Sequence, residues 1–189
     1  MEVIDIFTIP LFKKSLVIDN KKLLSYCLSL REEDSGRNVS NLGGWQSNDI
    51  VGPPHQLIDL LNCIKDFSSE VCNVLELHPV EVNNCWVNIN GYKDTNWPHT
   101  HGDAILSGVY YVNTPKDCGH IEFQNLYSEI VPTQLQISNR NRFNSGNLCM
   151  PSIEGLLYIF PSWLRHGVHP NFNLYEERVS ISFNLIHSK

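Results

Sequence analysis

Seven residues, Trp97-Pro98-His99-Thr100-His101-Gly102-Asp103, set the expected architecture of this chain. They contain the spacings His99-x-His101 and His101-x-Asp103 at once. In an extended chain, residues i and i+2 point to the same side, so either pair can hold one metal ion. The segment therefore predicts an extended stretch that carries two ligands of a metal centre.

A third ligand has to come from a distant part of the chain. His166 lies 65 residues after His101 and follows an apolar run at residues 155–160. Two histidines and a carboxylate on one face of an octahedron leave three positions open, as in non-haem Fe(II) oxygenases. A closed zinc site would need a fourth protein ligand. We therefore expect iron ligands at His101 and His166, with the third place open to His99 or to Asp103.

An arginine directly precedes the last predicted strand, residues 179–186. Arg178 stands twelve residues after His166, and Ser180 shares its side of the strand. A guanidinium binds a carboxylate through two parallel hydrogen bonds and stays charged when buried. Arg178, assisted by Ser180, is therefore expected to anchor the far end of a dicarboxylate co-substrate.

The order of these residues resembles that of the 2-oxoglutarate/Fe(II)-dependent dioxygenase superfamily, most closely its small 2OG-Fe(II) oxygenases of bacteria and phages. The resemblance covers residues 40–186 and is carried by Gly43-Gly44-Trp45-Gln46-Ser47, Trp86-Val87-Asn88-Ile89, His99-x-His101, Ser107-Gly108-Val109-Tyr110-Tyr111-Val112, Phe160-Pro161-Ser162 with His166, and Glu177-Arg178-Val179-Ser180. It implies a double-stranded β-helix, a cupin-like jelly roll, that uses Fe(II), 2-oxoglutarate and O₂. The implied reaction couples decarboxylation of 2-oxoglutarate to oxidation of a second substrate, most often its hydroxylation.

The resemblance also implies roles for further residues, with no catalytic group expected beyond the metal centre. Tyr111 is expected to reach the co-substrate carboxylate, and Asn88 to line the opposite wall. Related hydroxylases place an asparagine or tyrosine shortly before the first ligand histidine, and the spacing from Asn88 puts that ligand at His99. Trp45 and Gln46 lie on a glycine-hinged loop, and such loops often carry specificity. We expect these two side chains to touch substrate at the mouth of the site.

Hydrophobic periodicity predicts two helices followed by short strands. The helices are expected at residues 20–34 and 55–77, the second after Pro53-Pro54. Strands are expected at residues 3–7, 85–90, 105–112, 119–123, 135–137, 155–160, 166–169 and 179–186. This order indicates a mainly β fold with two N-terminal helices packed on it.

Length and composition predict one globular domain over residues 1–189, with a helical part at 1–80 and a β core at 81–189. The net charge of −6 and pI of about 5.7 disfavour nucleic acid, whose phosphates require basic surfaces. No apolar stretch has the length of a membrane span, and no signal sequence is evident. We expect a cytoplasmic protein, or one in the host cytoplasm if a phage encodes it. The expected partner is a small-molecule or peptide side-chain substrate, and a homodimer is compatible with the sequence.

Two other functions fit parts of the pattern. A cupin-like metal enzyme that does not use 2-oxoglutarate would explain His99-x-His101, with Glu122 as its carboxylate ligand, but would leave Arg178 without a purpose. A non-catalytic β-sandwich binding module would bind no metal. Metal binding and the requirement for Arg178 therefore separate the three hypotheses.

Overall fold

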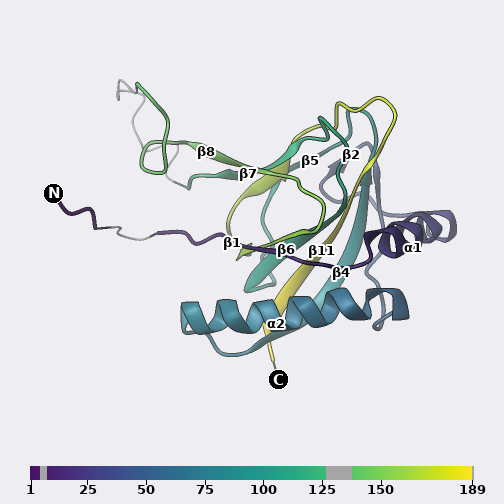
Figure 1. Ribbon diagram of the computed structural model, residues 1–189, viewed down its shortest axis with the longest axis horizontal. Coiled ribbons are helices and arrows are strands. Elements are labelled where there is room, and N and C mark those ends of the chain that lie inside the picture. Colours follow the sequence, from purple (N-terminus) through teal and green to yellow (C-terminus); the bar gives the residue numbers. More distant parts are fainter. Residues whose placement is uncertain (5–7, 127–137, 189) are drawn as a thin grey trace.

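Two antiparallel sheets form the body of the computed structural model, which describes residues 1–4, 8–126 and 138–188 (Figure 1). The larger sheet has the order β1-β9-β6-β11-β4-β3. Its strands are β1 (Phe12–Ser15), β3 (Trp45–Gln46), β4 (Val80–Asn90), β6 (Leu106–Asn113), β9 (Leu156–Pro161) and β11 (Arg178–His187). The smaller sheet has the order β2-β5-β10-β7-β8. Its strands are β2 (Asn41–Leu42), β5 (Thr95–His99), β7 (His120–Gln124), β8 (Asn147–Pro151) and β10 (His166–Val168).

From β4 onward the chain passes repeatedly from one sheet to the other. Strands β4, β6, β9 and β11 belong to the larger sheet, and β5, β7, β8 and β10 belong to the smaller one. Because segments distant in sequence thereby become neighbours, β5 pairs with β10, and β10 also pairs with β7. This is the predicted double-stranded β-helix, and the fold class is confirmed.

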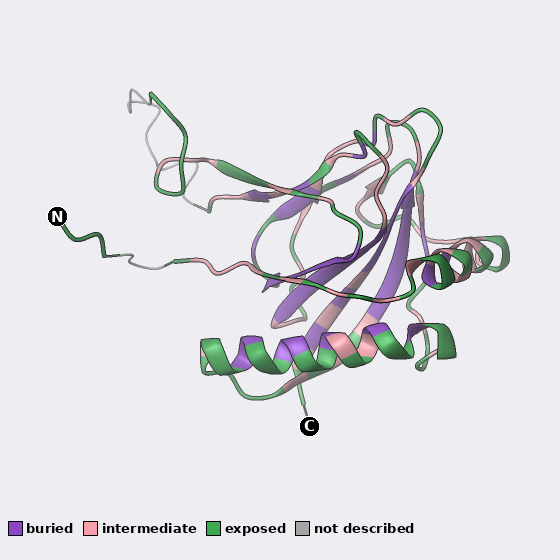
Figure 2. Ribbon diagram, in the orientation of Figure 1, coloured by how far each residue is buried: buried purple, intermediate pink, exposed green. Residues whose placement is uncertain are grey.

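Two helices pack on the outer face of the larger sheet (Figure 1). Helix α1 spans Asn20–Glu33 and is capped by the residue before it, Asp19. The Asp19 side chain accepts a hydrogen bond from the Lys22 backbone N–H at 3.1 Å, as a regular N-cap does. Helix α2 (Ile58–Leu75) follows a short 3₁₀ turn, η1 (His55–Leu57), and ends at Glu76 in the left-handed conformation. The apolar side of α2 is buried toward the sheet and its other side is exposed (Figure 2).

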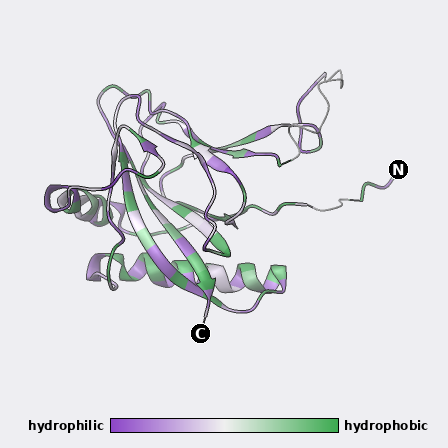
Figure 3. Cartoon of the chain, turned by 180° about the vertical axis from the view of Figure 1, so that it is seen from behind, coloured by the Kyte–Doolittle hydropathy of each residue, from purple (hydrophilic) through white to green (hydrophobic). Residues whose placement is uncertain are grey.

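Alternation along the long strands separates the helix-facing core from the inner face. On β4, Val87 and Ile89 belong to the core beneath the helices, whereas Asn88 and Asn90 point between the sheets. Figure 3 shows the same mixture of hydrophobic and hydrophilic residues along the strands of the larger sheet. A second apolar cluster, which includes Phe123 of β7 and Phe160 of β9, fills part of the space between the sheets. The remaining inner face is polar and forms the candidate site.

Most predicted elements are present, with shifted ends. Both helices and the strands predicted at 85–90, 105–112, 119–123, 155–160, 166–169 and 179–186 are confirmed. The strand predicted at residues 3–7 is wrong for Val3 and Ile4, which are exposed and outside any strand, and its residues 5–7 lie outside the described residues. The strand predicted at residues 135–137 also lies outside them. Strands β1, β2, β3, β5 and β8 were not predicted as separate elements. Within the described residues, no helix combines the length and apolar character needed to cross a membrane.

Candidate active site

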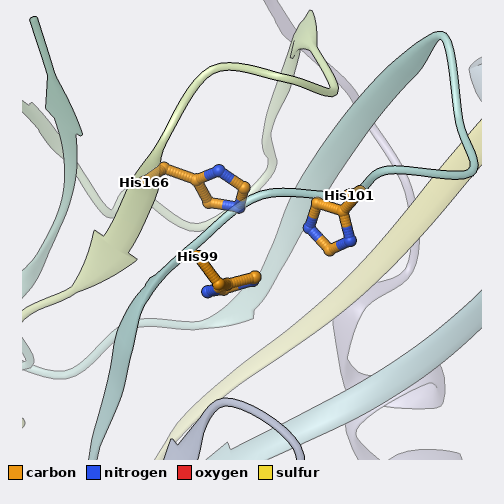
Figure 4. Close-up of side chains that lie close together, drawn as sticks. All are labelled: His99, His101 and His166. Atoms are coloured by element: carbon orange, nitrogen blue, oxygen red, sulfur yellow. The ribbon is translucent and has the colours of Figure 1, made fainter. Parts of the chain in front are cut away.

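Three histidines meet between the two sheets. His99 ends β5, His101 follows it by two residues, and His166 begins β10. Their potential ligand atoms all lie within 4.8 Å of one another, and their rings turn toward a common space (Figure 4). The cause is register, because β5 and β10 are antiparallel neighbours in which His166 stands directly opposite His99.

Backbone carbonyl groups orient two of the three rings. The Nδ1 atom of His99 lies 2.6 Å from the Trp97 carbonyl oxygen, and Nδ1 of His166 lies 2.8 Å from the Leu164 carbonyl oxygen. A carbonyl oxygen only accepts, so Nδ1 must carry the proton and donate it. Nε2 then presents its lone pair, which is the arrangement common among histidines that bind metals.

Burial keeps these imidazoles neutral. Loss of solvation, together with the neighbouring histidine rings, lowers the pKa of His166 to about 3 and that of His101 to about 4. Burial also lowers the pKa of His99. The rings of Phe160 and Phe123 pack against His166, with centroid distances of 4.6 Å and 6.1 Å. At neutral pH the cluster therefore offers three unprotonated nitrogen ligands beside an apolar wall.

Asp103 lies apart from this cluster. It is exposed, in the turn at residues 102–103 that connects β5 to β6. Strand β5 ends at His99, so the alternation that would have aligned Asp103 with His101 does not continue that far. The structure thus brings His99 to His101 and His166, and leaves the carboxylate of Asp103 on the surface.

Arg178 is fully buried on the opposite wall, with 1% of its surface exposed. Its Nη1 donates to the Cys118 carbonyl oxygen and, at 3.0 Å, to the His169 carbonyl oxygen. Burial lowers its pKa, but an arginine remains charged. Its Nη2 is buried with no hydrogen-bond partner among the described residues. A buried, charged donor of this kind indicates an acceptor that binds from outside the chain.

Register brings the other predicted co-substrate residues to the same wall. Ser180 of β11 stands opposite Asn88 of β4 on one side and Tyr111 of β6 on the other. Directly opposed residues share a face of the sheet, so these side chains surround one cavity together with Arg178. The Tyr111 hydroxyl and the Asn88 Oδ1 are buried and make no hydrogen bond of regular geometry within the described residues, although Ser152 lies close enough to the tyrosine hydroxyl to affect its pKa. Burial also raises the pKa of Tyr111 to about 12, so its hydroxyl is available as a donor.

The cavity has polar lining residues that sequence reasoning did not select: Ser40, Asn90, Asn96 and Ser182. Two of them could have been predicted from the sequence, because Asn90 follows Asn88 and Ser182 follows Ser180 at the strand period of two. Ser182 accepts a hydrogen bond from Asn88 Nδ2 at 3.1 Å. The other two reach the cavity only through the pairing of β2 and β5 and the loop before β2.

Trp45 and Gln46 are placed beside β4 and not among the residues described around the cavity. Trp45 stands opposite Ile89 and packs with the helix-facing core, where its indole N–H donates to the Asp34 carbonyl oxygen at 3.0 Å. Gln46 stands opposite Asn88 and is buried, with its Oε1 lacking a partner in the described part of the chain. The short β3 strand therefore turns the tryptophan to the face away from the histidines.

The sequence match decides the family. Residues 84–184, more than half of the chain, match the family described as "Putative 2OG-Fe(II) oxygenase". The chain belongs to this family. No curated protein matches the sequence. Membership makes the chain a 2OG-Fe(II) oxygenase, and the predicted dependence on Fe(II), 2-oxoglutarate and O₂ is confirmed.

Solved structures of 2OG-Fe(II) oxygenases share the fold. A prolyl-4-hydroxylase from Pseudomonas putida is 15% identical with a TM-score of 0.68, over 96% of this chain and 95% of that one. The viral collagen prolyl hydroxylase of Paramecium Bursaria Chlorella virus-1, in complex with 2OG, is 12% identical with a TM-score of 0.62, over 94% and 96%. The epimerase SnoN from nogalamycin biosynthesis is 13% identical with a TM-score of 0.66, over 95% and 79%. The fold therefore occurs with more than one reaction outcome.

The residues present fit both groups that the family uses. Three neutral imidazoles that face a cavity suit Fe(II), since imidazole is one of its common protein ligands. The unpaired half of the Arg178 guanidinium suits a carboxylate, and the Tyr111 hydroxyl lines the same cavity. The three histidines and Arg178 thus line one cavity.

Proposed function

We propose that this 2OG-Fe(II) oxygenase is a hydroxylase whose iron is held by His99, His101 and His166. The observation that carries the proposal is one cavity that contains a cluster of three neutral histidines and a buried arginine with a free Nη2. When bound, Fe(II) with 2-oxoglutarate and O₂ supplies the oxidising power for the reaction. The chain itself positions these groups and keeps water away from them.

Different residues around the cavity would bind the metal, the co-substrate and the substrate. His99 and His166 are held by backbone carbonyls, so their Nε2 atoms need no rearrangement to bind the ion. Arg178 receives the distal carboxylate of 2-oxoglutarate, with Ser180 and Tyr111 assisting. Asn88 lines the neighbouring wall, where its Oδ1 lacks a partner in the described residues. Gln46 lies next to Asn88 and is our candidate for a substrate contact, whereas the position of Trp45 supports a packing role.

A ligand set of three histidines has an electrostatic consequence. It leaves both positive charges of Fe(II) without a protein counter-charge, whereas a set with Asp103 would neutralise one of them. One carboxylate of 2-oxoglutarate would then neutralise one of the two positive charges of the iron, and the other would neutralise Arg178. We therefore infer that Fe(II) binds weakly alone and more tightly when 2-oxoglutarate is present.

The substrate that we propose is a peptide or small-molecule side chain. Two of the structures with this fold are prolyl hydroxylases, and the third acts in the biosynthesis of a small molecule. The net charge of −6 makes a nucleic-acid substrate unfavourable. Mass spectrometry of candidate substrates should detect the gain of one oxygen atom, and a product without added oxygen would contradict the hydroxylase assignment.

An anaerobic titration with Fe(II) and 2-oxoglutarate tests the ligand assignment. A chelated 2-oxo acid on Fe(II) gives a weak visible charge-transfer band, which we expect in the wild type and in the Asp103→Ala variant. The His99→Ala variant should lose the band, and Arg178→Ala should require much more 2-oxoglutarate to develop it. A band that depends on Asp103 and survives His99→Ala would refute the three-histidine set. Metal binding without any band would mean that 2-oxoglutarate does not chelate the metal at these histidines.

A further inference from the structure

A second group of side chains of types that bind metals lies on the outer face of the smaller sheet. Glu122 of β7, Cys149 of β8 and His169, which directly follows β10, have potential ligand atoms within 4.8 Å of one another. His169 Nε2 is 3.1 Å from Glu122 Oε2, and the Cys149 Sγ is 3.8 Å from the same oxygen. Cys149 is a free, exposed thiol.

Strand register produces this group independently of the three histidines. Glu122 stands opposite Cys149 on β8 and opposite Gly167 on β10. His169 follows Gly167 by two residues and so returns to the same face. On the inner face, Phe123 stands opposite His166. The two groups of potential ligands therefore lie on opposite faces of the smaller sheet, with His166 at the start of β10 in one and His169 just after its end in the other.

We propose that Glu122, Cys149 and His169 form a second metal site, for a divalent ion of the zinc class. Thiolate, imidazole and carboxylate are the ligands that zinc takes in proteins, and the thiolate disfavours Mg²⁺ and Ca²⁺. On binding, the thiol proton leaves to solvent, and the two negative ligands then neutralise the two positive charges of the ion. Glu122 and His169 are only partly buried and Cys149 is exposed, so a water molecule can complete a tetrahedron.

The position of this site links it to the oxygenase centre. The carbonyl of His169 accepts a hydrogen bond from Arg178 Nη1 at 3.0 Å, and His166 begins the strand that ends just before His169. Strand β8 is at the edge of the smaller sheet and pairs with β7 alone among the described strands. An ion bound here ties β8, β7 and the end of β10 together. It thereby holds the backbone that orients both His166 and Arg178.

Cobalt titration of the full-length, untagged protein under reducing, anaerobic conditions tests the site. Thiolate bound to Co(II) gives a near-ultraviolet charge-transfer band, and three histidines cannot give it because they contain no sulfur. We expect one equivalent of this band in the wild type and in a His99→Ala/His166→Ala variant. The Cys149→Ser variant should lose it, while Cys63→Ser, at a partly buried free thiol on α2, should keep it.

Two further variants examine the other ligands. Glu122→Gln and His169→Asn should each weaken cobalt binding at the thiolate by at least about tenfold. Cys149 is exposed, so its serine variant should fold normally, which circular dichroism can check. Absence of the band in the wild type, or a band that survives Cys149→Ser, would overturn the proposal. Equal, weak binding by wild type and Cys149→Ser at high cobalt alone would mean an adventitious ion only. None of these outcomes bears on the three-histidine centre.

Discussion

Arg178 shows how a single side chain can be prepared for a ligand that is not part of the chain. One half of its guanidinium is fixed by two backbone carbonyls, and the other half is buried without a partner in the described residues. Leaving a buried charged donor unpaired costs free energy, and a carboxylate that binds there recovers it. The conformational entropy of the Arg178 side chain is lost during folding, before the co-substrate binds.

An Arg178→Lys variant should bind 2-oxoglutarate about 10- to 100-fold more weakly. A hydrogen bond to a charged group contributes about 1.5–3 kcal/mol, and a lysine has no planar fork to keep the two-point contact. Isothermal titration with Fe(II) present measures this directly. Unchanged affinity in a folded Arg178→Lys protein would show that the co-substrate binds elsewhere.

A Tyr111→Phe variant removes only one hydroxyl group from the cavity that Arg178 lines. The hydroxyl makes no hydrogen bond of regular geometry within the described residues and has only a weak contact with the Ser152 hydroxyl, so its removal should alter the free energy of unfolding by less than about 1 kcal/mol. It should weaken 2-oxoglutarate binding several-fold, corresponding to about 1 kcal/mol. Urea unfolding and the same titration separate the two effects. A large loss of stability with normal co-substrate affinity would assign the hydroxyl to packing.

At the scale of elements, the end of α1 is tied to the segment around β3. The Asp34 carboxylate accepts hydrogen bonds from the Gly36 N–H at 2.8 Å, the Asn48 N–H at 2.9 Å and Asn48 Nδ2 at 2.8 Å. Its backbone carbonyl accepts from the Trp45 indole. Strand β3 borders β4 beside Asn88. The end of α1 therefore supports β3, which borders the part of β4 that lines the cavity at Asn88.

An Asp34→Asn variant should lose about 1–2 kcal/mol of stability at pH 7, because one acceptor oxygen becomes an amide donor that faces an N–H group. Hydrogen bonds from Gly36 and Asn48 lower the pKa of Asp34 in the folded state. Its contribution is therefore present above the unfolded pKa of about 3.9 and is lost as the pH falls through the lower, folded value. Urea unfolding at pH 7 and pH 3 should show the difference from wild type shrinking in acid. Asp66→Asn, at an exposed carboxylate on α2, is the control.

For the whole molecule, the helices and the larger sheet share one core. Leu60, Ile64 and Phe67 of α2 pack in the same cluster as Val87 and Ile181 of the sheet. Such a continuous core opposes separate unfolding of the helical part, residues 1–80, and the β core. We therefore propose that the chain behaves as one folding domain.

Ile64→Ala should test this domain assignment. Ile64 is fully buried, so the truncation should cost about 2–5 kcal/mol, whereas Asn62→Ala on the exposed side of α2 should cost little. The variant should still unfold in one transition, with circular dichroism and tryptophan fluorescence giving the same midpoint. Two separated midpoints would mean that the helical part and the β core are independent.

Local sequence patterns were sufficient to predict much of the secondary structure and several of the candidate site residues. The helices over α1 and α2 and the period-two strands follow from residues close together in sequence, and the order of short motifs along the chain was enough for the resemblance to 2OG-Fe(II) oxygenases. His101, His166 and Arg178 could be selected because histidine and arginine are suited to binding a metal and a carboxylate, and because their order along the chain is informative. Spacing within one strand also made Ser180 a partner of Arg178, since side chains alternate with a period of two.

Tertiary structure decided what depends on where strands end and which strands pair. His99, and not Asp103, joins the histidine cluster because β5 stops at His99 and the chain turns at residues 102–103. Glu122, Cys149 and His169 come from three separate segments and meet only through the register of β7, β8 and β10. Such registers are set by packing between segments distant in the chain, and no local pattern in the sequence contains that information.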